Sequence, residues 1–450
     1  MRAVNELDLI TPCERAASLL SKSDVDFFDV FASYTRSLNI EILGKGVSEA
    51  RARTDVGLGV RVFKNKGMGI AFSQSLKARD VERIVRKAIS FARMAQPDPY
   101  FRSIPGPSKA PSIPGLCDED IINLSLGDAA NLAERMIKAA AEVQGGAMYS
   151  GGLSGTHSKG YLLTSTGVSV VTEKTSVMAE LMLNYRRDDD VGSSYEYDYA
   201  ISLTEIDFEM IGRNAAQKAL EQFGSKKLES GVMSVILTPE STSSLVFSLM
   251  AAISGESAVK ARTFASSYLG KQIAPEMLEI NDDGTIAGAV ASSSYDGEGV
   301  PRRPLKVISR GRLISFLHNS YSAGIAGVES TGHAVRRGYG GNIGAGPTNI
   351  RVEPGDSSLD EMISETKIGV LATNVGFSPN MVSGEFSNTV DEGFFIKNGE
   401  KIHPIKNLMM GGHLLDLFRN IELISKEGRT IGKGFFFPSI KIGNVKFAGR

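Results

Sequence analysis

The sequence predicts an α+β protein in which a tandem-duplicated α+β N-terminal region is followed by a glycine-rich, mainly β C-terminal domain. Helical and strand-like hydrophobic periodicities follow one another along the chain, and one segment recurs after about 127 residues. The chain of 450 residues contains 48 glycines. A chain of this length forms two or three domains, each with a core of its own. We expect three parts, at 1–105, 106–228 and 229–450.

Composition and charge are those of a globular protein without a nucleic-acid or membrane signature. Hydrophobic residues make up 42%, charged residues 22%, and the net charge is -1. Such a chain has no global positive field that would attract nucleic acid. The only cysteines, Cys13 and Cys117, exclude a disulfide framework and are typical of a reducing compartment. No run approaches the ~18 apolar residues of a membrane span, and the N-terminus lacks a signal-peptide core. We expect a cytoplasmic protein.

The first part has the order helix, strands, helix. The apolar spacing predicts helices over 12–20 and 75–93. Between them, strands are expected over 27–34, 38–43, 56–63 and 67–72.

The same order recurs in the second part. Residues 202–215 align with residues 75–88, and a helix over 126–143 precedes them. Strands are expected over 160–163, 167–173 and 175–186. Agreement in element order as well as in sequence favours a tandem repeat over chance similarity between two capped amphipathic helices.

Two stretches of the N-terminal half are given structural interpretations. Residues 96–114 contain six prolines and are predicted to be a semi-rigid connector without a motif. The aspartates 188–190 are expected in a solvated turn, since adjacent side chains do not converge on a cation. Tyr195, Tyr197 and Tyr199 alternate with polar residues, as on one face of a strand, and lack the basic neighbours of a base-stacking surface.

The C-terminal half is predicted to be rich in short strands. Turns are expected at 282–284 and 295–299, and helices at 357–365 and 408–420. The alternating stretch 435–447 should end the sheet. Strands are also expected at 235–237, 305–308, 312–317, 348–352, 369–371, 393–397 and 401–405, with hairpin turns at 309–311 and 398–400.

A helix that follows Thr238 and Pro239 is too apolar for a surface helix. Thr238 or Ser241 is the expected N-cap, and proline is tolerated in a first helical turn. Its closely spaced apolar residues are Leu245, Phe247, Leu249, Met250 and Ile253. We expect this helix to lie in a core or to line a cleft.

No local sequence motif for catalysis or metal binding stands out. The five histidines, His157, His318, His333, His403 and His413, are too far apart in sequence to form a helical metal pair. Neither a nucleophile elbow nor a P-loop is present. Ser254 and Lys260 would lie on different faces of a helix, so a serine and lysine pair is disfavoured.

The densest glycine run, 338–346, is a flexible loop or a stretch of backbone that a ligand can approach closely. It lacks the lysine and the following helix of a phosphate loop. Main-chain pairing with an extended peptide is one use of such a run. Gly340, Gly341, Asn342 and Asn349 are the candidate peptide-binding residues.

Several motifs resemble the TldD/PmbA family, once described as modulators of DNA gyrase and now associated with metallopeptidase activity. The resemblance extends over the full length. The segments that carry it are 251–255, 320–323, 331–334, 347–350, 383–387 and the tail pattern around 404–415 and 437–440.

The resemblance implies the PmbA (TldE) branch, which lacks the metal. TldD-like members carry H-E-x-x-x-H on the buried helix, where two histidines hold zinc and the glutamate acts as general base, and a cysteine ligand near the C-terminus. The corresponding positions here are about Phe247, Ser248 and Ala252, and no cysteine follows Cys117. We therefore expect no catalytic residue, metal or cofactor in this chain.

The function that the resemblance implies is that of a non-catalytic subunit of a TldD/TldE-type metallopeptidase that processes or degrades unfolded peptides. Its expected partner is a TldD-like subunit that carries zinc, in a heterodimer, with a homodimer as the alternative. Two other hypotheses stay open. One is a peptidase with a non-standard metal site, built from His318, His333 or His413 with a carboxylate. The other is a binding protein that modulates DNA gyrase, without direct contact to DNA.

Overall fold

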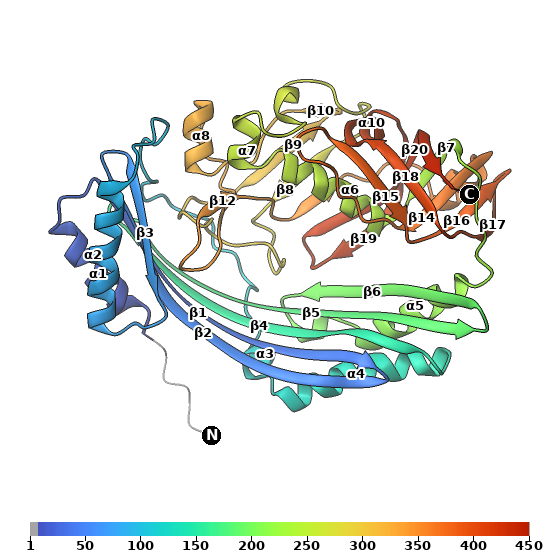
Figure 1. The fold of residues 1–450 in the computed structure, drawn as a ribbon, viewed down its shortest axis with the longest axis horizontal. Coiled ribbons are helices and arrows are strands. Elements are labelled where there is room, and N and C mark those ends of the chain that lie inside the picture. Colours follow the sequence, from blue (N-terminus) through green and yellow to red (C-terminus); the bar gives the residue numbers. More distant parts are fainter. Residues whose placement is uncertain (1–7, 450) are drawn as a thin grey trace.

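The N-terminal part of the chain folds around one long, curved sheet (Figure 1). The computed structural model describes residues 8–449. Residues 1–7, at the start of the segment that is predicted to lack a signal peptide, and residue 450 lie outside the described residues. The six strands of this sheet are β1 (Phe27–Gly44), β2 (Gly46–Lys64), β3 (Gly67–Ser73), β4 (Met148–Thr164), β5 (Ser169–Arg187) and β6 (Asp190–Ala200). They lie in the order β3-β2-β1-β4-β5-β6.

Each half of this sheet belongs to one unit with the order helix, three strands, helix. Besides a short α3 (Glu119–Asn123) and a 3-10 turn (Leu203–Glu205), the helices are α1 (Ile10–Ser21), α2 (Ala78–Met94), α4 (Leu126–Val143) and α5 (Phe208–Glu221). The two units meet where β1 pairs antiparallel with β4. The element order that the sequence predicts to recur is therefore present in the structure. The aligned helices begin at different points, since Asp207 is the N-cap of α5 whereas Asp80 lies inside α2.

The strands of this sheet are longer than predicted. The expected strands 27–34 and 38–43 form one strand, because the ladder between β1 and β2 runs from Phe27↔Phe63 to Leu43↔Gly46. The expected strands 167–173 and 175–186 likewise merge into β5. The polar stretches between them carry no apolar alternation, but their backbone groups are paired with a neighbouring strand. Asp188 and Asp189 form the predicted turn before β6.

Helices cover the convex side of the sheet in two groups (Figure 1). At one end, α1 and α2 bury apolar faces against β1 and β2 in a single cluster. The face of α2 follows helical periodicity through Val81, Ile84, Val85 and Ala88. At the other end, α4 and α5 pack on β4 and β5. Ser125 caps α4 by accepting a hydrogen bond from the backbone N–H of Asp128.

The C-terminal part lies along the concave side of the long sheet and is built on a second sheet (Figure 1). A small separate hairpin consists of β11 (Ala334–Arg336) and β12 (Ile343–Ala345). The strands of the second sheet are β7 (Gly231–Leu237), β8 (Ile280–Asp283), β9 (Pro304–Ser309), β10 (Arg312–Leu313), β13 (Ile350–Val352), β14 (Ile368–Asn374), β15 (Glu385–Val390), β16 (Glu392–Lys397), β17 (Glu400–Pro404), β18 (Leu408–His413), β19 (Ile421–Ile431) and β20 (Phe435–Ala448).

Both predicted hairpins of this part are present, as β9 with β10 and β16 with β17. The helices around the second sheet are mostly short. They are α6 (Pro239–Ala252), α7 (Gly255–Val259), α8 (Ser320–Ala326), α9 (Leu359–Ser364), α10 (Leu414–Arg419) and a 3-10 turn (Ser266–Tyr268). None of the helices within residues 8–449 is long and apolar enough to cross a membrane.

Four predictions for this part are wrong in detail. The expected helix 408–420 is a strand up to His413, and only α10 is helical. Gly411 and Gly412 are unfavourable in a helix, and the segment pairs with β15 and β20. The expected strand 312–317 ends at Leu313. Asp282, expected in a turn, is fully buried in β8. The last strand, β20, does not end the sheet but pairs with β7, β13, β18 and β19.

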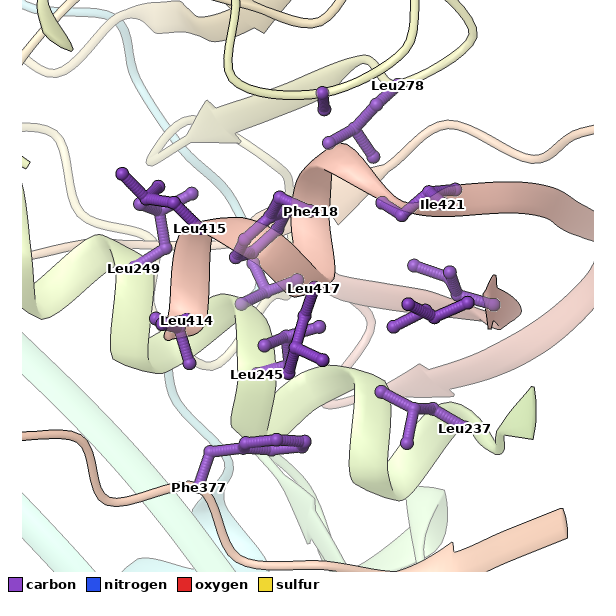
Figure 2. Close-up of a cluster of buried hydrophobic side chains, with 14 of the residues drawn as sticks. Leu237, Leu245, Leu249, Leu278, Phe377, Leu414, Leu415, Leu417, Phe418 and Ile421 are labelled. Carbon is purple, nitrogen blue, oxygen red and sulfur yellow. The ribbon is translucent and has the colours of Figure 1, made fainter. Parts of the chain in front are cut away.

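The largest core of the protein surrounds α6 in the C-terminal part. Figure 2 shows Leu245 and Leu249 of α6 among the side chains of α10, which include Leu415 and Phe418. All four are fully buried. The expectation of a buried helix is therefore confirmed for most of α6.

Buried ion pairs join the long sheet to the C-terminal part. Asp29 of β1 accepts hydrogen bonds from Arg61 of β2 at 2.6 Å and from Arg336 of β11 at 3.1 Å. Burial alone would raise the pKa of Asp29, but Arg336 and Arg61 hold it below its usual range. Glu298, 5% exposed, lies 3.7 Å from Arg61. We call these four residues the junction network.

Candidate functional site

The helix α6 is held by hydrogen bonds from its own polar side chains to a neighbouring segment. Thr238 is the N-cap residue and Pro239 follows at the first helical position, but no side chain caps the helix. Ser241 donates to the carbonyl of Ala372 at 3.1 Å, and Ser248 donates to the carbonyl of Phe377 at 3.0 Å. The buried hydroxyls of Ser241 and Ser248 are thus hydrogen-bonded within the protein and attach α6 to its neighbour.

The three positions that the family resemblance assigns to a degenerate zinc motif lie in different surroundings. Phe247 is 39% exposed and packs against Phe435 and Phe437, with ring centroids 5.6 and 5.9 Å away. Ser248 is 9% exposed, and Ala252 is fully buried. The structure therefore places Phe247 on the open side of α6 and Ala252 in the core.

These residues do not fit a zinc ion. Zinc in proteins is bound by the nitrogen of histidine, the sulfur of cysteine or the oxygen of a carboxylate. The phenyl ring of Phe247 and the methyl group of Ala252 offer no lone pair, and the hydroxyl of Ser248 is already hydrogen-bonded. Across residues 8–449, no three His, Cys, Asp or Glu side chains are arranged so that they could hold a metal ion.

The structure brings two of the scattered histidines together, but in the interior. Nε2 of His333 lies 3.3 Å from Oδ1 of Asp282, and the backbone N–H of His333 donates to the carbonyl of His318. Both histidines and Asp282 are at most 4% exposed. Burial, together with nearby His333, lowers the pKa of His318 to about 4. His413 lies elsewhere, as the N-cap of α10.

The glycine-rich run 338–346 is used for contact between the two parts of the chain. Its tip lies on the long sheet, where Tyr339 packs against Gly57 and Gly59 of β2. A Cβ atom on Gly59 would lie 1.6 Å from the carbonyl oxygen of Tyr339, so only glycine allows this approach. Gly340 lies against Phe72 in the same way. The end of the run, Ile343–Ala345, is paired as β12.

Of the four candidate peptide-binding residues, Asn342 lines a pocket, which is described below. Gly341 lies against the backbone of Arg337. Asn349 is fully buried, and its amide donates to the carbonyl of Asp283 at 2.6 Å and to the hydroxyl of Ser292 at 2.8 Å. Its amide is therefore occupied within the protein.

A pocket of about 940 Å³ lies where the long sheet, the proline-rich connector and the C-terminal part meet. One wall comes from the turn between β2 and β3 and from connector residues 98–109. The opposite wall comes from α7, α8 and residues 300–303, and Asn342 and Ile343 complete it. The size is in the range of pockets that hold small molecules or a few residues of a peptide.

A chain of polar contacts links the connector wall of the pocket to its C-terminal wall. The Tyr321 hydroxyl donates to Asp98 at 2.6 Å, and the Lys260 ammonium donates to the Tyr321 hydroxyl at 3.1 Å and to Glu256 at 2.9 Å. Burial and the hydrogen bond to Asp98 raise the pKa of Tyr321, so its hydroxyl is a neutral donor at physiological pH. The contacts of Lys260 and Tyr321 thus bridge the connector to α7 and α8.

The connector is the part of this pocket that the sequence prediction missed. Its six prolines indicate a spacer, but they do not predict which parts of the protein the spacer contacts. A usable signal was the presence of Tyr100, Phe101, Arg102 and Lys109 in a segment interpreted as a plain linker.

Models of three protein domains match successive segments of this chain. Residues 28–92, 119–223 and 230–449 match, in order, domain 1, the central domain and the C-terminal domain of the PmbA/TldA metallopeptidases. The chain belongs to the PmbA/TldA metallopeptidase family. The resemblance proposed from the sequence motifs is confirmed.

Relatives within this family are similar over almost their whole length. The metalloprotease PmbA of Escherichia coli O157:H7 is 27% identical, over 96% of this chain and 94% of that protein. A metalloprotease TldD homolog of Buchnera aphidicola is 25% identical, over 90% of this chain and 88% of that protein.

Solved structures of family members share the fold. TldE from Thermococcus kodakarensis superposes with a TM-score of 0.88 at 26% identity, over 96% of this chain and all of that one. A Thermotoga maritima protein named for modulation of a DNA gyrase gives a TM-score of 0.87 at 24% identity, over 97% of this chain and 99% of that one, and shows the fold alone.

Proposed function

We propose that this protein is a non-catalytic subunit of a TldD/TldE-type metallopeptidase complex that processes or degrades unfolded peptides. The observation that supports the proposal most directly is the absence of zinc donors at the motif positions of α6, where Phe247 and Ala252 stand. The zinc and the hydrolytic step then belong to a TldD-like partner, and this chain contributes surface that holds the peptide.

The non-standard metal site finds little support in the surroundings of the histidines. A catalytic zinc needs three protein ligands and an open position for water. His318, His333 and Asp282 are closed off from solvent, and Asp282 already accepts hydrogen bonds from the backbone N–H and the hydroxyl of Thr348. Unchanged metal content in His318→Ala, His333→Ala and His413→Ala would remove this alternative.

Titration into a TldD-like partner tests the proposal. We expect the peptidase activity of the partner, measured on an unfolded peptide, to rise with added chain and to level off at a fixed ratio of the two subunits. The matched control is a partner variant without its own zinc ligands, which should stay inactive at every ratio. Activity of that control mixture would assign the chemistry to this chain and overturn the proposal.

A further inference from the structure

The pocket between the connector and the C-terminal part has a strong imbalance of charge. Its lining includes seven cationic side chains and four carboxylates, in a chain whose net charge is -1. Arg61 lies beside Glu298, and Lys260 is paired with Glu256. Across residues 8–449, no carboxylate oxygen lies within 4.0 Å of the other cations, which are Lys66, Arg102, Lys109, Arg302 and Arg303.

We propose that this pocket binds an acidic peptide, with the carboxylates of the peptide completing the ion pairs that the pocket cations lack. The choice of a peptide rests on the proposed function, whereas the choice of negative charge rests on the pocket alone. The unpaired cations come from three separate segments: the turn after β2, the connector, and residues 302–303. Such a distribution suits several carboxylates along an extended ligand.

Arg302 supports the need for an anion. Its guanidinium donates to the hydroxyl of Ser293 and to the carbonyl of Gly332, both neutral acceptors. Burial lowers the pKa of Arg302, and the carboxylates of Asp296 and Asp282, both more than 4.0 Å away, offset this effect only in part. A carboxylate bound in the pocket would supply the missing compensation of Arg302.

The other lining of the pocket is apolar and exposed. Met68, Tyr100 and Val328 are among the large hydrophobic side chains that are 42%, 51% and 54% exposed. Phe63 and Phe101, which also line the pocket, stack with their ring centroids 4.0 Å apart. Exposed apolar groups beside unpaired charges are typical of binding surfaces. The ligand should therefore carry apolar side chains between its carboxylates.

The backbone of the pocket favours a peptide over a nucleotide. Pro105 and Pro107 of the connector have no backbone N–H, and the carbonyls of Pro105 and Ser108 accept hydrogen bonds from Thr166 and Tyr295. Within the described residues, the other N–H groups of residues 102–109 donate no hydrogen bond, so they are free for carbonyl groups of a peptide main chain. Phosphate binding would instead use free N–H groups at a helix start. Two such groups of α8 are occupied, since the backbone N–H of Ser320 donates to the carboxylate of Glu298 and the backbone N–H of Ser322 donates to the side chain of Asn319.

A binding experiment on the full-length chain tests the proposal. The probe is a fluorescein-labelled hexapeptide that alternates phenylalanine and glutamate, followed by fluorescence anisotropy. The matched probe carries lysine in place of glutamate. We expect saturable binding of the glutamate peptide and at least about tenfold weaker binding of the lysine peptide.

Variants locate the binding. Arg102 and Lys109 are exposed and make no side-chain hydrogen bond to another described residue, so Arg102→Glu with Lys109→Glu should fold normally and raise the Kd at least about tenfold. The neutral pair, Arg102→Gln with Lys109→Gln, should have a smaller effect. The charge-matched control is Lys87→Glu with Lys138→Glu, on exposed faces of α2 and α4. It should change the Kd by less than about twofold.

Three outcomes would overturn the proposal: equal binding of the two peptides, equal loss in the pocket and control variants, or displacement of the glutamate peptide by ATP at lower concentration than by unlabelled peptide. The last would assign the pocket to a nucleotide. The measurement uses the chain without a zinc partner, so its failure leaves the subunit proposal standing, and failure of the partner titration leaves this one standing.

Discussion

Two regions of the molecule, α6 and the pocket beside the connector, differ in whether their polar groups have partners within the chain. Around α6 the buried hydroxyls of Ser241 and Ser248 have acceptors, and the remaining space is filled with hydrocarbon. In the pocket, five cations have no carboxylate partner among the described residues, and large apolar side chains are exposed. The first arrangement stabilises a fold, whereas the second leaves interactions free for a ligand.

The comparison indicates which part of a chain without zinc donors at the motif positions of α6 has side chains free to bind a ligand. The helix α6, to which the family resemblance assigns the metal motif of TldD-like members, is part of the largest core. Binding capacity lies instead between the two parts of the chain, next to the junction network. There, paired and unpaired charges lie side by side, since Arg61 belongs to both the network and the pocket lining.

The largest expected effect comes from breaking the junction network. Asp29→Asn leaves Arg61 and Arg336 buried without their carboxylate, which should lower the free energy of unfolding by about 3–5 kcal/mol. Arg102→Gln, which removes an unpaired pocket cation, should change it by less than about 0.5 kcal/mol. Urea denaturation compares the two. Similar losses of unfolding free energy in the two variants would contradict the claim that the paired cations stabilise the fold and the unpaired ones do not.

The core around α6 gives the next effect. Leu249→Ala removes a fully buried side chain and should lower the free energy of unfolding by about 2–5 kcal/mol. Phe247→Ala, four-tenths exposed on the same helix, should have less than half that effect despite the larger ring. Thermal unfolding of both variants measures the difference. An equal or larger loss for Phe247→Ala would show that the open side of α6 is part of the core.

Acid should weaken the interior next to the pocket through His318. Its pKa is about 4 in the folded protein and 6.5 ordinarily, so between these values the unfolded chain binds more protons and stability falls as the pH falls. The full difference amounts to about 3 kcal/mol. Glu392, whose burial raises its pKa to about 6, has the opposite sign between pH 4.5 and 6.

The variant His318→Gln separates the two contributions, because Glu392 is unchanged in it. Urea denaturation between about pH 7 and pH 4.5 should show a smaller loss of stability for the variant than for the natural protein. Parallel curves for the two proteins would contradict the assigned protonation of His318.

The smallest expected effect is the dependence of peptide binding on salt. The affinity for the glutamate hexapeptide should fall severalfold between about 50 and about 300 mM sodium chloride, because the exposed cations of the pocket are screened. Arg303→Gln should lower the affinity about threefold and reduce the salt dependence. Salt-independent binding would assign the affinity to Met68, Tyr100 and Val328 alone.

The sequence predicted what depends on local pattern. The apolar spacing of α6, the turn at Asn398 and Gly399, and the recurring helix, strand, helix order are properties of neighbouring residues. It did not predict the length of β1 and β2, because pairing across strands extends them through polar residues. It also predicted that Phe247 is buried, whereas this residue is 39% exposed in the structure.

The pocket could not be predicted because it depends on tertiary contact. Lys66, Arg102 and Arg303 are distant in sequence, and each by itself is an ordinary exposed cation. The glycine run illustrates the same limit. Its composition is compatible with ligand binding, yet Tyr339 uses the absence of side chains at Gly57 and Gly59 to join the two parts of the protein.

Zinc content and peptidase activity of the protein alone test the central claim most directly. The full-length chain, purified without a partner and incubated with excess zinc before desalting, should retain far less than one zinc per chain by elemental analysis and should not hydrolyse an unfolded peptide. Retention of about one zinc per chain, together with hydrolysis that a chelator abolishes, would contradict the claim that this family member holds peptides without cleaving them.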